Sequence, residues 1–180
     1  MPGQSVKIVV FGGSGFIGGR LARRLLHKGH DVVIADIAKS AQFPELVKYC
    51  DVREIKDVVS ACTGSDVVYN LAAVHRDDVV PRSLYREVNV GGAVSICAAA
   101  SRLGIKNVVF TSSCAVYAFG EGEIDEEETP APFNDYGRSK LEAEEVHKRW
   151  AVEHGGRALA IVRPTVVFGE GNRGNVFTLI

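Results

Sequence analysis

The sequence predicts an α/β protein built on one doubly wound parallel sheet. Short and almost wholly apolar runs alternate with longer segments in which apolar residues recur at helical spacing, in the order β-α-β-α-β-α-β-α-β-α-β. The 180 residues suffice for one domain with a sizeable core, and 46% of them are apolar. With a formal net charge of −1, nothing in the composition indicates a nucleic-acid or membrane partner.

The first strand and the first helix flank a glycine-rich turn. The apolar run 8–11 is followed by Gly12, Gly15 and Gly18, after which helical spacing continues to Gly29. One glycine permits the sharp turn, a second lets the backbone approach a pyrophosphate, and the third lets the helix pack on the strand. The helix N-terminus then attracts phosphate groups. The triplet alone also fits a plain tight turn, but its context favours dinucleotide binding.

The second strand ends in an acid at the position expected for a ribose ligand. The run 32–35 is apolar and Asp36 follows it, 18 residues beyond Gly18, where such an acid is expected about 20 residues on. A carboxylate there accepts hydrogen bonds from the ribose 2′-hydroxyl and repels a 2′-phosphate. Asp36 therefore favours NAD over NADP.

A third strand, 46–50, runs into Asp51 and Val52. These two residues could meet the adenine at the sheet edge. Asp51 could equally cap the N-terminus of the following helix, 55–62, which Gly64 ends. The two interpretations of Asp51 do not exclude each other.

The fourth strand, 67–71, is followed by the small residues Ala72 and Ala73. Ligands of open α/β sheets lie outside the carboxyl ends of the strands, so small residues there leave room for a cofactor, although they also fit a close-packed turn. A charged loop leads to a helix over 82–103, closed by Gly104. Its many small residues allow close approach, either to the sheet or to another subunit.

The remaining elements follow the same alternation. A fifth strand, 107–110, precedes an acidic loop at 120–132, which we interpret as solvated surface. The next helix covers 136–153, and the sixth strand covers 158–162.

A second group of residues indicates catalysis. Tyr136 and Lys140 lie four residues apart at the start of a helix and therefore share a face. A tyrosine of pKa near 10 is a poor base at neutral pH, but a nearby ammonium and a positively charged nicotinamide would lower its pKa. Ser113 follows the fifth strand and could bind the same substrate oxygen. Taken alone, Tyr136 and Lys140 also fit an ordinary pair on a helix surface. Taken alone, Ser113 fits a strand-end hydroxyl that satisfies backbone groups.

The cysteines and histidines indicate no metal site. The cysteines form no C-x-x-C pair, and we expect them to be reduced core thiols; they are Cys50, Cys62, Cys97 and Cys114. Four histidines near predicted helix ends are expected at the surface: His27, His30, His147 and His154. No apolar run approaches the roughly 20 residues of a membrane span, and the N-terminus lacks the regions of a signal peptide. We expect a cytoplasmic protein.

These motifs together resemble the extended short-chain dehydrogenase/reductases, and within them the NAD-dependent epimerase/dehydratase family that acts on nucleotide sugars. The residues that carry the resemblance are GGSGFIG at 12–18, Asp36, NLAA at 70–73, NVGG at 89–92, TSSCAVY at 111–117, YGRSK at 136–140 and RPTVVFG at 163–169. The resemblance implies that Tyr136 is the catalytic base, Lys140 its modulator and a ribose ligand, and Ser113 the hydroxyl that orients the substrate.

The resemblance also implies contacts and partners. The NAD contacts expected are Gly12, Gly15, Phe16, Ile17, Gly18, Asp36, Ile37, Asp51, Val52, Leu71, Ala72, Ala73, Asn89, Thr111, Tyr136, Lys140, Pro164 and Val166. The substrate contacts expected are His75, Ser113 and Asn175. Helices 82–103 and 136–154 are expected to pair across a homodimer. Cys114-Ala115 stand where sugar dehydratases carry an acid pair, which argues for an epimerase or a reductase.

We therefore expect an NAD-binding Rossmann domain over 1–170 and the start of a truncated substrate-binding lobe over 171–180. The function expected is 4-epimerisation of a UDP-sugar-like substrate through a 4-ketosugar, with little turnover in a chain that lacks the lobe. One alternative is an NAD-dependent oxidoreductase acting on a ketosugar or another small carbonyl. A second is a dinucleotide-binding module without catalysis.

Overall fold

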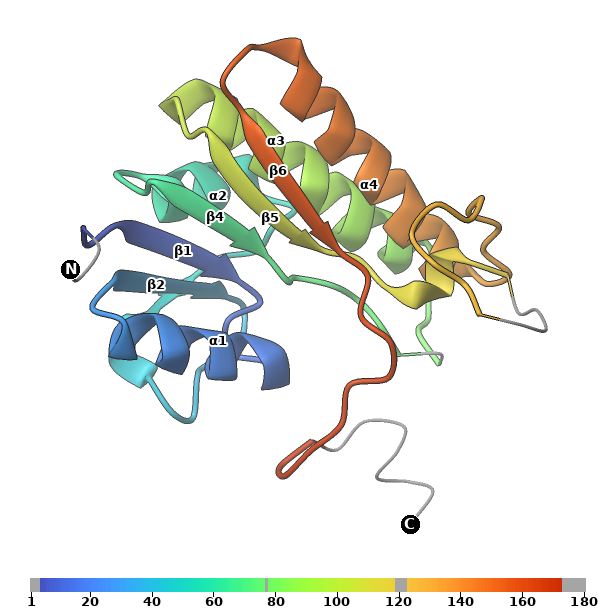
Figure 1. The fold of residues 1–180 in the computed structure, drawn as a ribbon. Helices are drawn as coiled ribbons and strands as arrows, with labels where there is room; N and C mark the ends of the chain where they lie inside the picture. Colours follow the sequence, from blue (N-terminus) through green and yellow to red (C-terminus); the bar gives the residue numbers. More distant parts are fainter. Residues whose placement is uncertain (1–3, 77, 119–122, 173–180) are drawn as a thin grey trace.

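The computed structural model describes residues 4–76, 78–118 and 123–172, in which six parallel strands form one sheet in the order β3-β2-β1-β4-β5-β6 (Figure 1). The strands are β1 (Lys7–Phe11), β2 (Asp31–Asp36), β3 (Val47–Tyr49), β4 (Val67–Asn70), β5 (Asn107–Thr111) and β6 (Ala158–Val162). The α-helices are α1 (Phe16–His27), α2 (Ile55–Cys62), α3 (Gly92–Leu103) and α4 (Asp135–Glu153). This strand order confirms the predicted doubly wound sheet, in which the order of the strands reverses between β1 and β4.

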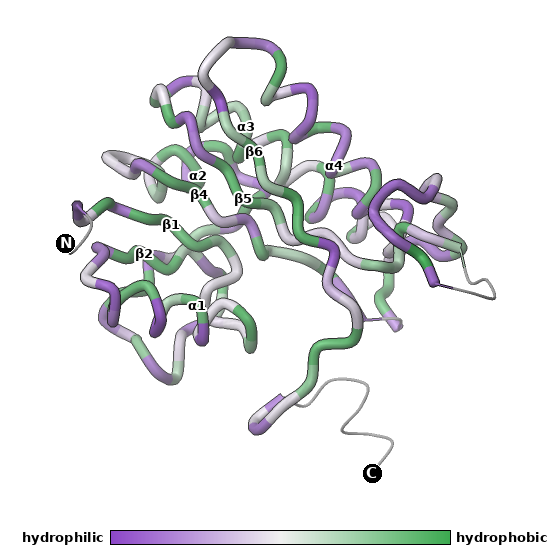
Figure 2. The backbone as a smooth tube through the Cα atoms, in the orientation of Figure 1, coloured by the Kyte–Doolittle hydropathy of each residue, from purple (hydrophilic) through white to green (hydrophobic). Residues whose placement is uncertain are grey.

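The two faces of the sheet bury separate cores. Alternate residues of β1, such as Val9 and Phe11, pack with α2, α3 and Trp150 of α4. The intervening residues, such as Val10, pack with α1 through Ala22. Figure 1 shows α1 on one face and the other three helices on the opposite face, and Figure 2 shows the hydrophobic residues following the central strands. Burial on both faces explains why these strands are nearly continuous apolar runs.

Part of the sheet is covered on one face only. The strand β6 alternates exposed and half-buried residues, and Val162 at its carboxyl end is 48% exposed. The described residues place no helix over this side of β5 and β6, opposite α3 and α4 (Figure 1). The site at the carboxyl ends of these strands is therefore supported from one side.

His147 is buried, so its expected surface position is wrong. Its ring is 0% exposed and stacks on Phe110, with centroids 4.2 Å apart. Its Nδ1 lies 2.7 Å from the carbonyl oxygen of Ala143, and its Nε2 lies 3.4 Å from Nδ2 of Asn70. His147 belongs to the middle of α4, on the face that the helix turns toward the sheet, and not to a helix end.

Two further expectations are wrong in detail. Cys114 is exposed, unlike the three other cysteines, because it begins the 3-10 turn η3 (Cys114–Val116) outside the sheet. Asp51 does not cap α2, whose N-cap residue is Glu54. The Asp51 carboxylate instead accepts a hydrogen bond from the backbone N–H of Arg53 at 3.0 Å and forms an ion pair with its guanidinium at 2.6 Å.

Burial of His147 makes stability depend on acid pH. Burial lowers its pKa to about 4 from an ordinary value of 6.5. Between these two pH values the unfolded chain binds a proton at this histidine and the folded chain does not. We expect the free energy of unfolding to fall between pH 6.5 and pH 4 by about 2–3 kcal/mol on this account. Urea denaturation of His147→Gln should show a weaker pH dependence over this range. The exposed His154→Gln should match the unchanged chain, and equal slopes in all three would contradict this interpretation.

Candidate active site

The predicted site residues come together at one edge of the sheet. Because all six strands are parallel, their carboxyl ends share this edge. The glycine turn follows β1, Asp36 ends β2, Ala72 follows β4 and Ser113 follows β5. Pro164 follows β6 and accepts a hydrogen bond through its carbonyl oxygen from the Cys114 N–H, at 3.0 Å. Residues far apart in the sequence thus surround a common edge.

The glycine turn is held by backbone contacts that no side chain would fit. Gly12 has φ +73°, and a Cβ there would lie 2.8 Å from the backbone nitrogen of Ala72. A Cβ on Gly18 would overlap the carbonyl oxygen of Gly12, so α1 starts directly against the turn. Gly15 caps α1 without a side-chain hydrogen bond, and the first turn of α1 carries no acid. These features fit a pyrophosphate, because the N–H groups at this helix start are left to an anion.

Asp36 joins the end of β2 to the glycine turn. Its Oδ2 accepts a hydrogen bond from the backbone N–H of Ser14 at 3.0 Å, and its Oδ1 accepts one from that of Ala38 at 2.9 Å. The Ser14 hydroxyl donates to the carbonyl oxygen of Ala38 at 2.9 Å. The predicted ribose ligand therefore also fixes the turn beside it.

Asn89 connects the loop after β4 with the start of α4. It lies in the π-helix η2 (Tyr85–Gly91), and its Nδ2 donates to the carbonyl oxygen of Val74 at 3.0 Å and to the Ser139 hydroxyl at 2.8 Å. The Val74 N–H donates in turn to Oδ1 of Asn89 at 2.8 Å. The Ser139 hydroxyl donates to the carbonyl oxygen of Tyr136 at 2.7 Å. Asn89 was predicted as a cofactor contact, whereas the hydrogen bonds by which Ser139 links Asn89 to Tyr136 were not predicted.

Ser113 and Tyr136 lie beside each other. The Ser113 side chain lies close enough to Tyr136 to lower the pKa of its phenol, and the Ser113 Oγ accepts the N–H of Ala115 at 3.1 Å. A Cβ on Gly137 would overlap the carbonyl oxygen of Ala115, so α4 can approach η3 only with glycine at this place. Gly137 was not among the predicted site residues, although a glycine within a helix is costly enough to suggest a packing role.

Burial shifts the pKa values of both Tyr136 and Lys140 in the chain without cofactor. It raises the pKa of Tyr136, and the Ser113 hydroxyl opposes this only in part. Burial lowers the pKa of Lys140 to about 7, against the attraction of Glu144. The Lys140 Nζ lies 4.4 Å from the centre of the Phe110 ring. Without a cofactor, Tyr136 is therefore a protonated phenol at neutral pH. The phenolate is expected only when the charges of Lys140 and of the nicotinamide lie beside it.

The other predicted contacts differ in how deeply they are buried. Val52 is buried against Gly92, and the half-buried residues are Phe16, Asp51, Leu71, Ala73 and Thr111. The exposed ones are Ile17, Ile37, His75 and Val166. Asn175, like nearly all of the segment 171–180, lies outside the described residues.

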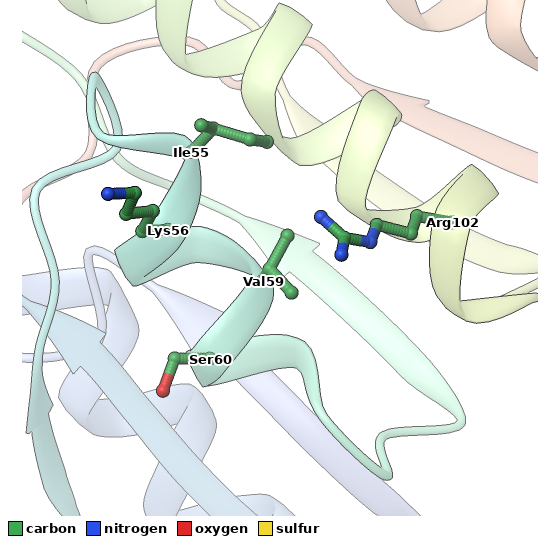
Figure 3. Close-up of a pocket in the computed structure, with 5 residues that line it drawn as sticks. All are labelled: Ile55, Lys56, Val59, Ser60 and Arg102. Carbon is green, nitrogen blue, oxygen red and sulfur yellow. The ribbon is translucent and has the colours of Figure 1, made fainter.

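A surface groove elsewhere contains none of the predicted site residues. It lies between α2 and α3 and is lined by Ile55, Lys56, Val59, Ser60 and Arg102 (Figure 3). Among the described residues, no helix is long and apolar enough to cross a membrane. The same part of the chain holds no group of three or more His, Cys, Asp or Glu that could bind a metal ion.

Comparison with known proteins defines the class to which this fold and site belong. Residues 8–179 match the NAD dependent epimerase/dehydratase family, and the chain belongs to this family. Over 174 residues it is 44% identical to N-acetyl-alpha-D-glucosaminyl-diphospho-ditrans,octacis-undecaprenol 4-epimerase of Escherichia coli O157:H7, covering 96% of this chain and 52% of that protein. The chain thus spans about half the length of that curated relative.

Two solved structures with bound NAD are similar. UDP-glucose 4-epimerase from Brucella ovis, in complex with NAD, matches with a TM-score of 0.80 and 30% identity, over 88% of this chain and 51% of that one. MoeE5 in complex with UDP-glucuronic acid and NAD matches with a TM-score of 0.85 and 28% identity, over 95% and 58%.

Lys140 should destabilise the free chain. In the unfolded chain it keeps a pKa near 10.5, so as pH falls from 10.5 to about 7 only the unfolded state gains the proton, and below pH 7 the loss of stability is complete. We expect Lys140→Met to raise the free energy of unfolding at pH 6.5 by roughly 2–4 kcal/mol, and much less at pH 10. Thermal and urea denaturation measure this. The exposed Lys56→Met serves as the control, and a destabilised Lys140→Met would refute the argument.

Proposed function

We propose that the chain is the cofactor-binding and catalytic half of an NAD-dependent 4-epimerase acting on a sugar diphosphate. The proximity of Ser113 and Tyr136, at the edge that also carries the glycine turn, supports this most directly. The glycine turn would hold the pyrophosphate of NAD, Asp36 its adenosine ribose and Lys140 its nicotinamide ribose. The bound cofactor would accept a hydride from the sugar and return it.

The chain's own residues would move one proton in each direction. Tyr136, as phenolate, takes the proton of the sugar 4-hydroxyl while C4 loses a hydride, which leaves a 4-ketosugar. Ser113 donates a hydrogen bond to the same oxygen and holds it beside Tyr136. When hydride returns to the opposite face of C4, Tyr136 gives back the proton. Proton and hydride both return, so no reduced cofactor is released.

The proposed substrate class rests on a positional requirement: the sugar C4 must be held within about 3–3.5 Å of the nicotinamide for hydride transfer. A diphosphate remote from C4 supplies binding energy for this positioning. The Escherichia coli relative is named for a sugar on a polyprenyl diphosphate, and the Brucella ovis structure for a UDP-sugar. A sugar 1-diphosphate is the chemistry that both share.

Two further expectations stay predictions. They are the pairing of helices 82–103 and 136–154 across a homodimer, and a cytoplasmic location.

The reaction is tested by an isotope assay. We would join residues 1–172 to the carboxyl-terminal half of the Escherichia coli relative and supply NAD with C4-deuterated N-acetylglucosamine, linked either to UDP or to undecaprenyl diphosphate. We expect the 4-epimer to form with deuterium retained and no NADH accumulation. Tyr136→Phe should lose at least about 100-fold in turnover, the usual scale for a proton-transfer group. The exposed Tyr49→Phe is the matched control.

The two alternatives give different results in this assay. Transfer of deuterium into accumulating NADH would indicate the oxidoreductase. Tight NAD binding without turnover on either sugar would favour the non-catalytic module. Equal turnover in Tyr136→Phe and in the chain without the change would remove the proposed base.

Cofactor choice is tested separately by calorimetry on the 180-residue chain. We expect NAD to bind at least about tenfold tighter than NADP, because Asp36 repels a 2′-phosphate. Asp36→Asn keeps the size of the side chain and should narrow this preference. Asp31→Asn, an exposed change at the other end of β2, should leave it unaltered. Tighter binding of NADP by the unchanged chain would contradict the assignment.

A further inference from the structure

A buried ion pair lies beside the candidate active site and has no part in the mechanism above. Glu144 is 0% exposed and lies one helical turn beyond Lys140 on α4. Arg163 follows β6 directly and donates to it through two atoms, with Nη2–Oε2 at 2.6 Å and Nε–Oε1 at 2.9 Å. A buried pair rarely stabilises a fold more than apolar residues of similar volume, so its presence calls for another explanation.

Arg163 joins the elements that carry the candidate catalytic residues. Its Nη1 donates to the phenolic oxygen of Tyr117, the C-cap residue of the turn η3, whose N-cap residue is Ser113. The backbone beside it adds two bonds to the same segment, from the Ser112 N–H to the Val162 carbonyl at 2.7 Å and from the Cys114 N–H to that of Pro164 at 3.0 Å. Through Glu144, the pair fixes this junction to α4.

Glu144 is also the negative charge that acts on Lys140. The Lys140 side chain is 2% exposed, and burial disfavours its ammonium form, whereas Glu144 favours it. The ionised form of Glu144 is itself secured: burial raises its pKa, but the hydrogen bonds and charge of Arg163 outweigh this. The titratable and charged groups of the cluster are Tyr136, Lys140, Glu144, His147 and Lys148 on α4, Tyr117 at η3 and Arg163 after β6.

We propose that Glu144 and Arg163 form a positioning pair for the active site, in which Glu144 is the counter-charge of the Lys140 ammonium and Arg163 holds Glu144 against the Ser113 turn. The purpose of the pair rests on the proposed roles of Tyr136 and Lys140. Its direct consequence, the charge of Lys140 near neutral pH, is a property of the chain without cofactor or substrate.

The test is a pH titration of the lysine side-chain amines by NMR on the ¹⁵N-labelled 180-residue chain, with Lys140→Arg to assign the Lys140 signal. We expect the Lys140 midpoint in Glu144→Gln to lie at least about one pH unit below that of the unchanged chain. Glu145→Gln is the matched control, since Glu145 is exposed and neighbours Glu144. Both carboxylates contact the Lys148 ammonium, Glu145 at 2.8 Å and Glu144 at 3.6 Å. It should leave the midpoint in place.

Glu144→Gln leaves Arg163 buried without its partner and could unfold the chain. The double variant Glu144→Met with Arg163→Met removes both charges and keeps the volume. It should lower the Lys140 midpoint in the same direction, because the Glu144 charge is the one that favours the Lys140 ammonium. A Lys140 midpoint equal to that of the unchanged chain, in either folded variant, would overturn the proposal. A lowered midpoint in a protein without epimerase activity would support the pair and count only against the proposed function.

Discussion

The contact between α1 and the turn after β1 is the constraint on which the site depends. A Cβ on Gly18 would overlap the Gly12 carbonyl, and a Cβ on Gly12 would overlap the backbone after β4, so neither position tolerates a side chain. This contact fixes the start of α1 at the centre of the sheet edge, beside the point where the strand order reverses. Asp36 reinforces it through the N–H of Ser14. The helix end proposed to bind the phosphates and the acid proposed to select the ribose are therefore set by one packing arrangement.

The helix α4 supplies the other half of the site at a cost in stability. Its inner face carries Lys140, Glu144 and His147, all almost fully buried, where an ordinary amphipathic helix would place apolar residues. Lys140 lies over the Phe110 ring and His147 stacks on it, so one aromatic side chain serves both. Polar groups buried in this way are concentrated where a protein needs perturbed pKa values.

The sequence was informative wherever local composition decides the structure. The bounds of α2 and β6 match the predicted ones, because Gly64 closes α2 and Arg163-Pro164 closes the short apolar run of β6. The position of His147 was not predictable in the same way, because its polar neighbours on α4 mimic an exposed face. Cys114 follows an apolar strand, and only the turn η3 turns it outward. The links through Ser139 and Gly137 depend on contacts between distant segments, which periodicity does not encode.

The charge states of the free site oppose those that the proposed reaction needs. Burial favours a neutral Tyr136 and weakens the ammonium of Lys140, whereas the reaction requires a phenolate beside a cation. A low-dielectric site penalises each charge alone but favours two opposite charges in contact. In the proposed reaction, Tyr136 would therefore become a base only when positive charge is drawn toward it, from the oxidised nicotinamide and from Lys140 held at the ribose. A site built in this way stays a weak base until its cofactor is in place, which ties proton removal to the presence of a hydride acceptor.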